Sequence, residues 1–312
     1  MNSRIVVFGS INADLVFPLE KLPTKGETVL GINYSFHPGG KGANQAVAAS
    51  RAGAEVTFIG CLGKDAFAEE LLNSLVQSNV DVSQINRVNS PSGCAAIGVD
   101  PGGANQIMVA AGANLHVMAS RVPDNLLTPT TIVVLQMEVP AKENWSLIKR
   151  AKASGSKVIL NLAPAGAVPL ETLSLIDFLI VNELEVLILA RDLGLKEKQP
   201  IEAAKKIAQL TKKTCILTLG EDGAFASNSI NVWRVPALAL DPVDTTAAGD
   251  CFVGWLAARL ASGDNLEQSL RWASVAAGKA CLISGAQTSL PNFRSVEASL
   301  SDLPRDSSPH LN

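Results

Sequence analysis

The sequence predicts an α/β fold, a doubly wound and mainly parallel β-sheet flanked by helices, with a small β-sheet lid. The first observation behind this prediction is that short apolar runs alternate with stretches of helical periodicity, as in sheets whose strands are joined by helices. The second is that polar residues follow several of these runs, at the strand ends where such sheets bind ligands. The third is that two extended segments contain no helical pattern.

The main-sheet elements can be placed along the chain from their apolar patterns. Buried strands are predicted at residues 5–8, 56–60, 131–136, 157–161, 178–181 and 214–219. Helices are predicted at residues 43–51, 66–79, 142–154, 201–210 and 251–261. Asn12 and Asp14 follow the first strand, Glu138 follows the third and Asn182 follows the fifth, so these side chains should meet at one edge of the sheet.

The extended segments, 28–36 and 94–109, suit a small sheet that projects from the main domain. The second contains Asp100-Pro101-Gly102-Gly103-Ala104-Asn105, a strong hairpin-turn signal. We expect lid strands within about 15–36 and 93–110, forming a flap that excludes water from a ligand. Pairing with the lid of a second subunit would cover its exposed edges. Residues 1–300 are predicted to form one domain, and the polar tail 301–312 is predicted to be disordered.

Composition excludes several classes of function. The chain has 312 residues, 47% hydrophobic and 18% charged, with a net charge of −3 and no polybasic run, so we expect neither a nucleic-acid nor a membrane surface. We see no signal peptide, transit peptide or transmembrane stretch, and five cysteines without a CxxC pair indicate a reducing, cytoplasmic compartment. The three histidines do not cluster, which disfavours a histidine metal site or a Ser-His-Asp triad.

The segment from Pro242 to Asp250 is the most informative part of the sequence. Ala247, Ala248 and Gly249 have little side chain, so the backbone N–H groups at this predicted helix start can approach an anion closely. Asp250 lies in the first turn, where a carboxylate would repel a phosphate unless it takes a proton from an incoming hydroxyl. An anion site beside a base is what phosphoryl transfer to an alcohol requires, although an ordinary acidic helix start gives the same pattern.

A second segment, Pro38-Gly39-Gly40-Lys41-Gly42-Ala43-Asn44-Gln45-Ala46, opens another helix with three glycines around one lysine. Glycine allows tight turns and close approach of backbone to a ligand, while Lys41 and Asn44 add a cation and an amide. The spacing is neither that of a P-loop nor that of a dinucleotide fingerprint. Taken alone, it is also compatible with a plain strand-to-helix turn.

Together the two segments resemble the PfkB-type carbohydrate kinase family, its ribokinase branch in particular. The resemblance runs from about Ile5 to Pro291 and includes three further motifs in the family's order: Gly9-Ser10-Ile11-Asn12-Ala13-Asp14, Asn182-Glu183-Leu184-Glu185 and Thr218-Leu219-Gly220-Glu221-Asp222-Gly223. It implies a kinase that transfers the γ-phosphate of ATP to the 5-hydroxyl of D-ribose, assisted by Mg²⁺ and activated by K⁺, and a homodimer formed through the lid.

The resemblance also implies a role for each matching position. Asp250 would be the base, and Ala247, Ala248 and Gly249 would form the anion hole. The sugar set is Asn12, Asp14, Gly40, Lys41, Asn44, Glu138 and Asp250. The nucleotide set is Asn182, Thr218, Gly220, Glu221, Gly223, Gly249 and Ser274, although many relatives carry a larger polar side chain at the position of Ser274. Glu185 would hold Mg²⁺ through water, and the K⁺ set is Asp244, Thr246, Ala280, Ile283, Gly285 and Ser289.

Other functions fit the sequence less well. Fructose, nucleoside or pseudouridine kinases share the family motifs, but a nucleoside kinase should stack its base on aromatic side chains and only 4% of this chain is aromatic. A non-catalytic sugar-binding regulator could lose its base, whereas Gly249 and Asp250 are intact. A dinucleotide dehydrogenase is the weakest alternative, because the first strand and helix lack its glycine fingerprint.

Overall fold

The computed structural model describes residues 4–304, and its core is one nine-stranded sheet. The strand order is β13-β12-β11-β10-β9-β8-β1-β4-β5, parallel except for β12 and β13. The bounds are β1 Arg4–Phe8, β4 Glu55–Leu62, β5 Asp81–Arg87, β8 Ile132–Leu135, β9 Lys157–Asn161, β10 Phe178–Asn182, β11 Thr214–Thr218, β12 Ala224–Ser227 and β13 Val232–Val235. The predicted α/β class is confirmed.

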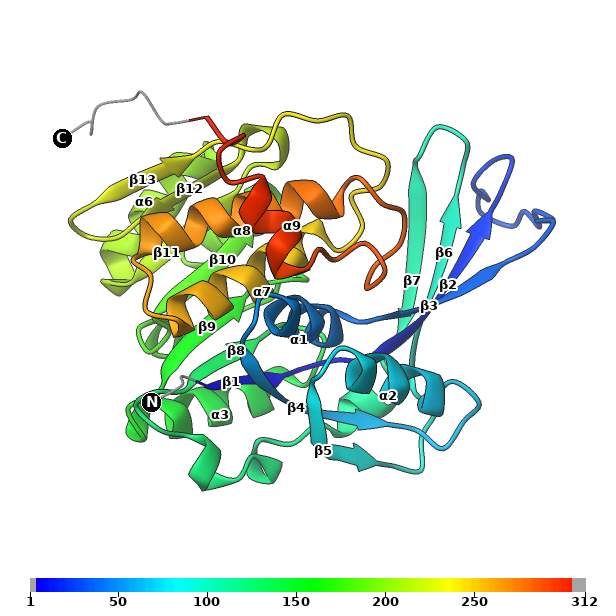
Figure 1. Ribbon diagram of the computed structural model, residues 1–312, viewed down its shortest axis with the longest axis horizontal. Coiled ribbons are helices and arrows are strands. Elements are labelled where there is room, and N and C mark those ends of the chain that lie inside the picture. The colour runs from blue at the N-terminus through cyan, green and yellow to red at the C-terminus, as the bar shows by residue number, and fades with distance from the viewer. Residues whose placement is uncertain (1–3, 305–312) are drawn as a thin grey trace.

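Helices cover both faces of this sheet. In Figure 1, α1, α7 and α8 lie in front of the strands. The bounds are α1 Lys41–Arg51, α2 Ala68–Gln77, α3 Ala141–Ala153, α4 Leu170–Leu173, α5 Glu183–Asp192, α6 Pro200–Thr211, α7 Ala248–Ala261, α8 Leu266–Ala280 and α9 Phe293–Ala298. Within residues 4–304, no helix is both long enough and apolar enough to cross a bilayer.

The alternation of side chains along β1 explains the two layers. Ile5 and Val7 pack into the apolar cluster under α1 and α7, while Val6 and Phe8 pack into the cluster on the opposite face. All four are fully buried, because successive side chains of a strand point to opposite faces. Strands covered on both sides read as continuous apolar runs, which is why the sequence indicated a parallel sheet.

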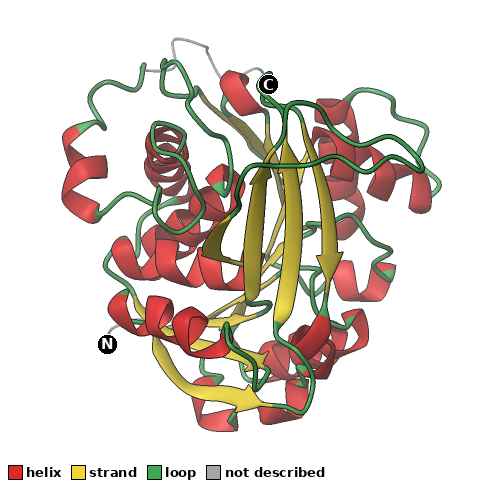
Figure 2. Cartoon of the chain, turned by 90° about the vertical axis from the view of Figure 1, so that its right-hand side faces the viewer, coloured by secondary structure: helices red, strands yellow, loops and turns green. Residues whose placement is uncertain are grey.

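A second sheet of four strands forms the lid. Its order is β3-β2-β6-β7, with β2 at Asn12–Pro18, β3 at Ser35–Gly39, β6 at Gly93–Val99 and β7 at Asn105–Ala110. Figures 1 and 2 show this sheet standing away from the main one as an upright flap. The predicted hairpin between β6 and β7 is confirmed, because Asp100 accepts hydrogen bonds from the N–H groups of Gly102 and Ala104.

Two boundary predictions need correction. The segment 28–36 was expected to be extended, but β3 begins only at Ser35, and the stretch before it is largely exposed loop. The predicted disordered tail does not begin at residue 301, because Leu303 is buried and Arg271 donates hydrogen bonds to the carbonyls of Leu303 and Pro304. The rest of that predicted tail, residues 305–312, lies outside the described residues.

Candidate active site

The glycine loop before α1 is held against the segment that joins β1 to β2. Gly40 has φ of 89°, and a Cβ added there would lie 2.7 Å from the backbone nitrogen of Asn12. An added Cβ at Gly42 would lie 2.6 Å from the nitrogen of Ser10. Both positions therefore require glycine for close backbone approach. This packing brings Lys41 and Asn44 next to the residues that follow the first strand.

Glu138 joins the same cluster from the end of β8. Its Oε2 accepts hydrogen bonds from the Ser10 hydroxyl, at 2.6 Å, and from the backbone N–H of Lys41, at 3.1 Å. These contacts cross 128 and 97 residues of sequence. Glu138 therefore fixes the start of α1 against β1 while its remaining lone pairs stay available for a ligand.

Asp14 lies at the base of the lid on β2, close to Gly39. A Cβ at Gly39 would lie 1.9 Å from the Asp14 Oδ2, so glycine there leaves room for this carboxylate. Burial and, to a smaller extent, the negative charges of Glu138 and Asp250 together raise the pKa of Asp14 to about 7, against the opposing effect of Lys41. The attraction of Asp250 raises the pKa of Lys41 despite burial, so this ammonium stays charged.

Asp250 lies in the first turn of α7 and is 7% exposed. Its Oδ2 accepts a hydrogen bond from Asn44 Nδ2 at 3.0 Å, and its Oδ1 accepts one from Gln45 Nε2 at 2.9 Å. The carboxylate is thus held in one orientation by two amides from α1. The Asn44 Oδ1 is buried without a hydrogen-bond partner among the described residues, so it can accept from a ligand hydroxyl.

The predicted anion hole is a sharp turn into α7. Ala247 adopts the left-handed conformation, with φ of 59°. Among residues 4–304, the backbone N–H groups of Ala247, Gly249 and Asp250 have no hydrogen-bond acceptor, whereas the N–H of Ala248 points to the Thr245 carbonyl at 3.2 Å. A Cβ at Gly249 would meet no protein atom within 4 Å, so the space in front of the helix is open. The arrangement suits an anion.

The predicted K⁺ residues come from two loops that Asp244 ties together. Its Oδ1 accepts from the N–H of Thr246 at 2.9 Å, and its Oδ2 accepts from the N–H of Gly285 at 2.8 Å and from Ser284. Burial raises the pKa of Asp244, but these hydrogen bonds outweigh it and lower the pKa overall. Within residues 4–304, no lysine or arginine forms an ion pair with Asp244, so a negative charge remains for a monovalent cation.

The other predicted K⁺ positions lie along the second loop. Ala280 ends α8 and its carbonyl accepts from the N–H of Ile283, while Ser289 is buried and donates its hydroxyl to the Ala286 carbonyl. The part of the chain described here contains no cluster of three His, Cys, Asp or Glu side chains that suits a metal ion. A K⁺ ion would therefore depend mainly on backbone carbonyls.

Asn182 and Glu185 form a capping box at the start of α5. The Glu185 Oε2 accepts from the Asn182 N–H, and the Asn182 Oδ1 accepts from the Glu185 N–H, both at 2.8 Å. Burial raises the pKa of Glu185, opposed by this hydrogen bond and by Lys41. Within the described residues, its Oε1 has no hydrogen-bond partner, and a single free carboxylate oxygen fits an Mg²⁺ ion that keeps most of its waters.

The predicted nucleotide residues lie beyond β11. Residues from Leu219 to Gly223 make a tight turn into the antiparallel strand β12, with Gly220 and Gly223 at φ of 57° and 85°. Thr218 ends β11, and Gly220 and Glu221 are exposed, so their polar groups are open to a ligand. Ser274 is buried on α8 and donates its hydroxyl to the Pro236 carbonyl at 2.7 Å. That hydroxyl proton is not free for adenine.

Four further site residues are amides that the sequence analysis did not single out. The Gln45 Nε2 donates hydrogen bonds to Asn161 and to Asp250, and Gln136 donates one to the Gln45 Oε1. Asn114 lies in the 3-10 turn Gly112–His116, and holds the N–H and carbonyl of Ile11 and the Asn12 Oδ1. The available signals were weak: Gln45 lies inside the glycine motif, Gln136 and Asn161 lie at strand ends, and Asn114 has no such marker.

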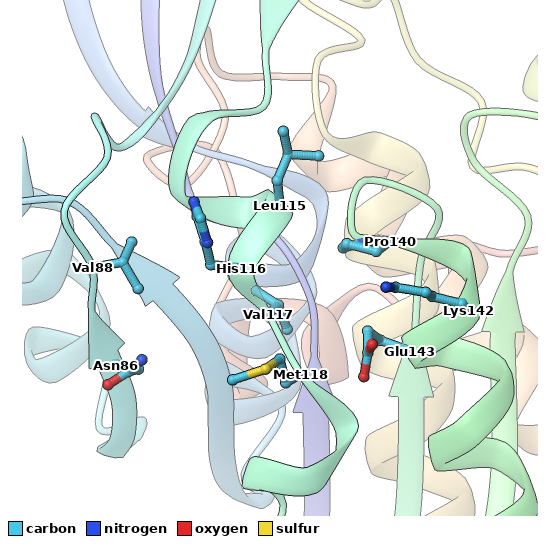
Figure 3. A pocket seen from close by; sticks show the side chains of 9 residues that line it. All are labelled: Asn86, Val88, Leu115, His116, Val117, Met118, Pro140, Lys142 and Glu143. Atoms are coloured by element: carbon cyan, nitrogen blue, oxygen red, sulfur yellow. The ribbon is translucent and has the colours of Figure 1, made fainter.

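A separate hollow of about 240 Å³ lies between the 3-10 turn Gly112–His116 and the start of α3. Figure 3 shows His116 and Lys142 on opposite sides of it, with Met118 below. Both His116 and Lys142 are exposed. None of the predicted site residues lines this hollow, so it is distinct from the cluster around Asp250.

A comparison with known families agrees with this site. A model described as pfkB family carbohydrate kinase matches residues 2–292. The chain belongs to the pfkB family of carbohydrate kinases. It is accordingly an ATP-dependent carbohydrate kinase, as its resemblance to ribokinases implied.

Individual relatives of this pfkB kinase are ribokinases. The chain is 36% identical to the ribokinase of Haemophilus influenzae, over 93% of this chain and 96% of that one. A crystal structure of ribokinase from Thermotoga maritima superposes with a TM-score of 0.88 at 33% identity, covering 96% of this chain and 98% of that one. Arabidopsis thaliana ribokinase complexed with ribose and ATP gives 0.84 at 32% identity, covering 96% and 99%.

Proposed function

We propose that this kinase transfers the γ-phosphate of ATP to the 5-hydroxyl of D-ribose, with Asp250 as the base. The observation that carries the proposal is a buried carboxylate, fixed by two amides, at the open N-terminus of a helix. The ribokinase relatives support ribose as the sugar, and one of them is described in complex with ribose and ATP.

In the proposed reaction, the sugar lies between the base of the lid and α1. Asn12, Asp14, Gly40, Lys41, Asn44 and Glu138 would bind its hydroxyls. The 5-oxygen attacks the γ-phosphorus, the bond from that phosphorus to the bridging oxygen of ADP breaks, and the hydroxyl proton passes to Asp250. The N–H groups of Ala247, Gly249 and Asp250 would stabilise the charge on the transferring group.

The nucleotide and ions are assigned to neighbouring loops. The turn at Thr218, Gly220, Glu221 and Gly223 would hold ATP, with Asn182 near its phosphates, and Ser274 would contribute packing rather than a hydrogen bond. Glu185 would hold Mg²⁺ through water, and that ion would neutralise phosphate charge. The two loops joined by Asp244 would hold K⁺. The cytoplasmic location stays a prediction.

The assembly we propose is a homodimer formed through the lid. Support comes from exposed apolar side chains of the lid and of the loop between β2 and β3, which include Leu30, Ile32, Tyr34 and Met108. Large exposed apolar patches mark interaction surfaces. A hollow of about 540 Å³ lies among these side chains, where side chains of a second copy could pack.

The proposed function is tested by measuring ATP consumption with ribose, deoxyribose, fructose, adenosine and pseudouridine. We expect the highest kcat/KM with ribose. In parallel, Asp250→Asn should keep the fold and most sugar binding but lower turnover about 10²- to 10⁴-fold, because a general base contributes that much. Preference for another acceptor would overturn ribose, and near-normal turnover of Asp250→Asn would overturn the base.

A further inference from the structure

A chain of buried amides runs from the main sheet to Asp250. Gln136, which follows β8, donates its Nε2 to the Gln45 Oε1 at 2.8 Å. The Gln45 Nε2 donates to the Asp250 Oδ1 at 2.9 Å and to the Asn161 Oδ1 at 3.1 Å. The Asn161 Nδ2 points to the Ile180 carbonyl at 3.3 Å. We call Gln136, Gln45 and Asn161 the amide chain.

The orientation of each amide in this chain is fixed by its neighbour. An ionised carboxylate only accepts hydrogen bonds, so Gln45 must direct its NH₂ group toward Asp250. Its Oε1 then faces Gln136, which must present an NH₂ group in turn. At the other end, the Ile180 carbonyl requires the NH₂ group of Asn161, so the Asn161 oxygen faces Gln45. Reversing Gln45 alone would place oxygen against oxygen at the contacts with Asp250 and Asn161, and NH₂ against NH₂ at the contact with Gln136.

Gln45 and Gln136 are both 0% exposed, which separates them from the side chains that can reach a substrate. Asn44, which precedes Gln45 on α1, has a side-chain oxygen without a protein partner among the described residues. Both polar side-chain atoms of Gln45, by contrast, are bonded to Gln136, Asn161 and Asp250. A buried amide beside a carboxylate is costly unless its own donors and acceptor are paired, as they are in Gln45. The Oε1 of Gln136, by contrast, has no hydrogen-bond partner among the described residues, so Gln136 spends its one side-chain contact on Gln45. The contacts of Gln45 therefore act on Asp250 rather than on the sugar.

We propose that Gln45 is a positioning residue for Asp250 and that Gln136 keeps the Gln45 amide turned toward it. The inference rests on the proposed function, in which Asp250 accepts the hydroxyl proton. Gln45 holds Oδ1 while Asn44 holds Oδ2, so the remaining lone pairs of the carboxylate face the site. A base displaced by about 1 Å can lose about 10²-fold in rate, so this alignment bears directly on kcat.

The test compares three variants of the full chain with ribose and ATP. Gln45→Glu keeps the shape of the side chain but replaces the donor with a carboxylate. Gln45→Met keeps the length and removes the donor without adding charge. Gln136→Glu leaves Gln45 in place but draws its NH₂ group away from Asp250. We expect kcat to fall about 10²-fold in each, with the KM values for ribose and ATP changing much less.

The pH dependence distinguishes a donor from a packing residue. In Gln45→Glu, the new carboxyl lies beside Asp250, and like charge favours its protonated form. Lowering the pH restores an O–H donor, so the ratio of its kcat to that of the wild type should rise as the pH falls. Ile207→Ala, a buried change on the remote helix α6, controls for lost stability and should leave kcat unchanged.

Each result either supports or overturns the positioning role of Gln45. Wild-type kcat in Gln45→Met or Gln136→Glu would overturn the positioning role, even if Gln45→Glu fails to fold. Equal pH profiles for Gln45→Glu and the wild type would overturn the donor role. A wild-type enzyme that phosphorylates no sugar would overturn the proposed function and this inference with it, whereas an active wild type with unaffected variants overturns this inference alone.

Discussion

At the scale of single residues, the candidate site is a group of acidic side chains that lie close together and partly buried from solvent. Asp14, Glu138 and Asp250 repel one another, and only Lys41 offsets them among the charges that act on Asp14. Burial and the neighbouring like charges raise the pKa of Asp14, and clusters of this kind are typical of functional sites rather than of stable cores. The site is therefore assembled at some expense of stability.

Replacing Asp14 by Asn should separate stability from binding. The pKa of Asp14 is about 7 in the folded protein against 3.8 for an unperturbed aspartate, so the native state holds an extra proton between these values. Asp14 therefore lowers wild-type stability as the pH rises from about 4 to about 7, and the penalty is complete above that range. Asp14→Asn should raise the melting temperature more at pH 8 than at pH 4.

The same variant should bind ribose more weakly while ATP binding changes little, because Asp14 lies on the lid strand β2 and not on the β11–β12 turn. Calorimetry with each ligand checks this. A selective loss of ATP affinity would contradict the assignment, and a melting-temperature gain that is equal at both pH values would show that Asp14 is not the titrating group.

The sequence singled out the side chains that face the candidate site more readily than the buried amides behind them. Asp14, Asn44 and Asp250 stand in recognisable motifs, and the structure brings them together. Gln45 stood inside the glycine motif without an assigned role, since its partner Gln136 is 91 residues away. A hydrogen bond between two glutamines depends on how two distant segments pack, and local sequence carries no signal for that.

At the scale of elements, the close contact of α1 with α7 brings Asn44 and Gln45 to Asp250. Gly254 makes that contact possible. A Cβ at this position would lie 2.5 Å from the Gln45 carbonyl oxygen and 2.6 Å from the Ala48 Cβ. The side of α1 that meets Gly254 carries Ala48 and Ala49, whose small side chains let the two helices approach closely.

Gly254→Ala should therefore destabilise the protein although alanine favours helices. Overpacking of this kind costs about 1–3 kcal/mol, which exceeds the roughly 1 kcal/mol gained in helix propensity. It should also lower kcat, because α1 must move away from Asp250. Gly166→Ala is the control, since its added Cβ would meet only the terminal methyl group of Met137, at 3.1 Å, which can move aside. Equal melting temperatures for the two variants would refute the close-contact argument.

Element boundaries failed where local signals were weak. An extended segment was expected from residue 28, but β3 begins only at Ser35, and Leu30 and Ile32 before it are almost fully exposed in a loop. Strands β12 and β13 were not predicted, because four-residue runs such as Ala224–Ser227 carry little periodicity. Long buried strands such as β9 were predicted correctly, since burial on both faces leaves a continuous apolar run.

Potassium should activate the enzyme more than sodium does, because Asp244 and the loop at Gly285 would order the start of α7. The Asp244 carboxylate already accepts from Thr246 and Gly285, and a cation beside it would hold the adjoining N–H groups before phosphate arrives. Each preorganised donor affects turnover about 10²- to 10³-fold, so the effect should appear in kcat. Equal rates in potassium and tetramethylammonium at matched ionic strength would show that the loop needs no ion.

At the scale of the whole molecule, the lid is an open sheet with two different faces. The register pairs Asp14 with Ala95 and Ala95 with Val109, so these side chains share the face that borders the proposed sugar site. The intervening residues, among them Phe17, Ala96 and Met108, share the outer face with Tyr34. Every residue of the edge strand β7 is exposed, including the apolar Ile107, Met108 and Val109, so within the described residues this edge is without cover.

Met108→Glu should therefore convert the proposed dimer into a monomer. Met108 is 70% exposed and lies on the outer face, where a second lid would bury it, and a charge placed at such a contact loses its hydration without gaining a partner. Val76→Glu introduces the same charge at a 49% exposed apolar position on α2 and should leave the assembly unchanged. Sedimentation velocity over a range of concentrations distinguishes the two species.

A wild type that stays monomeric at all concentrations, or a Met108→Glu variant as dimeric as Val76→Glu, would show that the outer face of the lid is not the contact. If the dimer does dissociate, ribose affinity should fall as well, because a lid that loses its contacts with a second lid is less restrained in its position over the sugar.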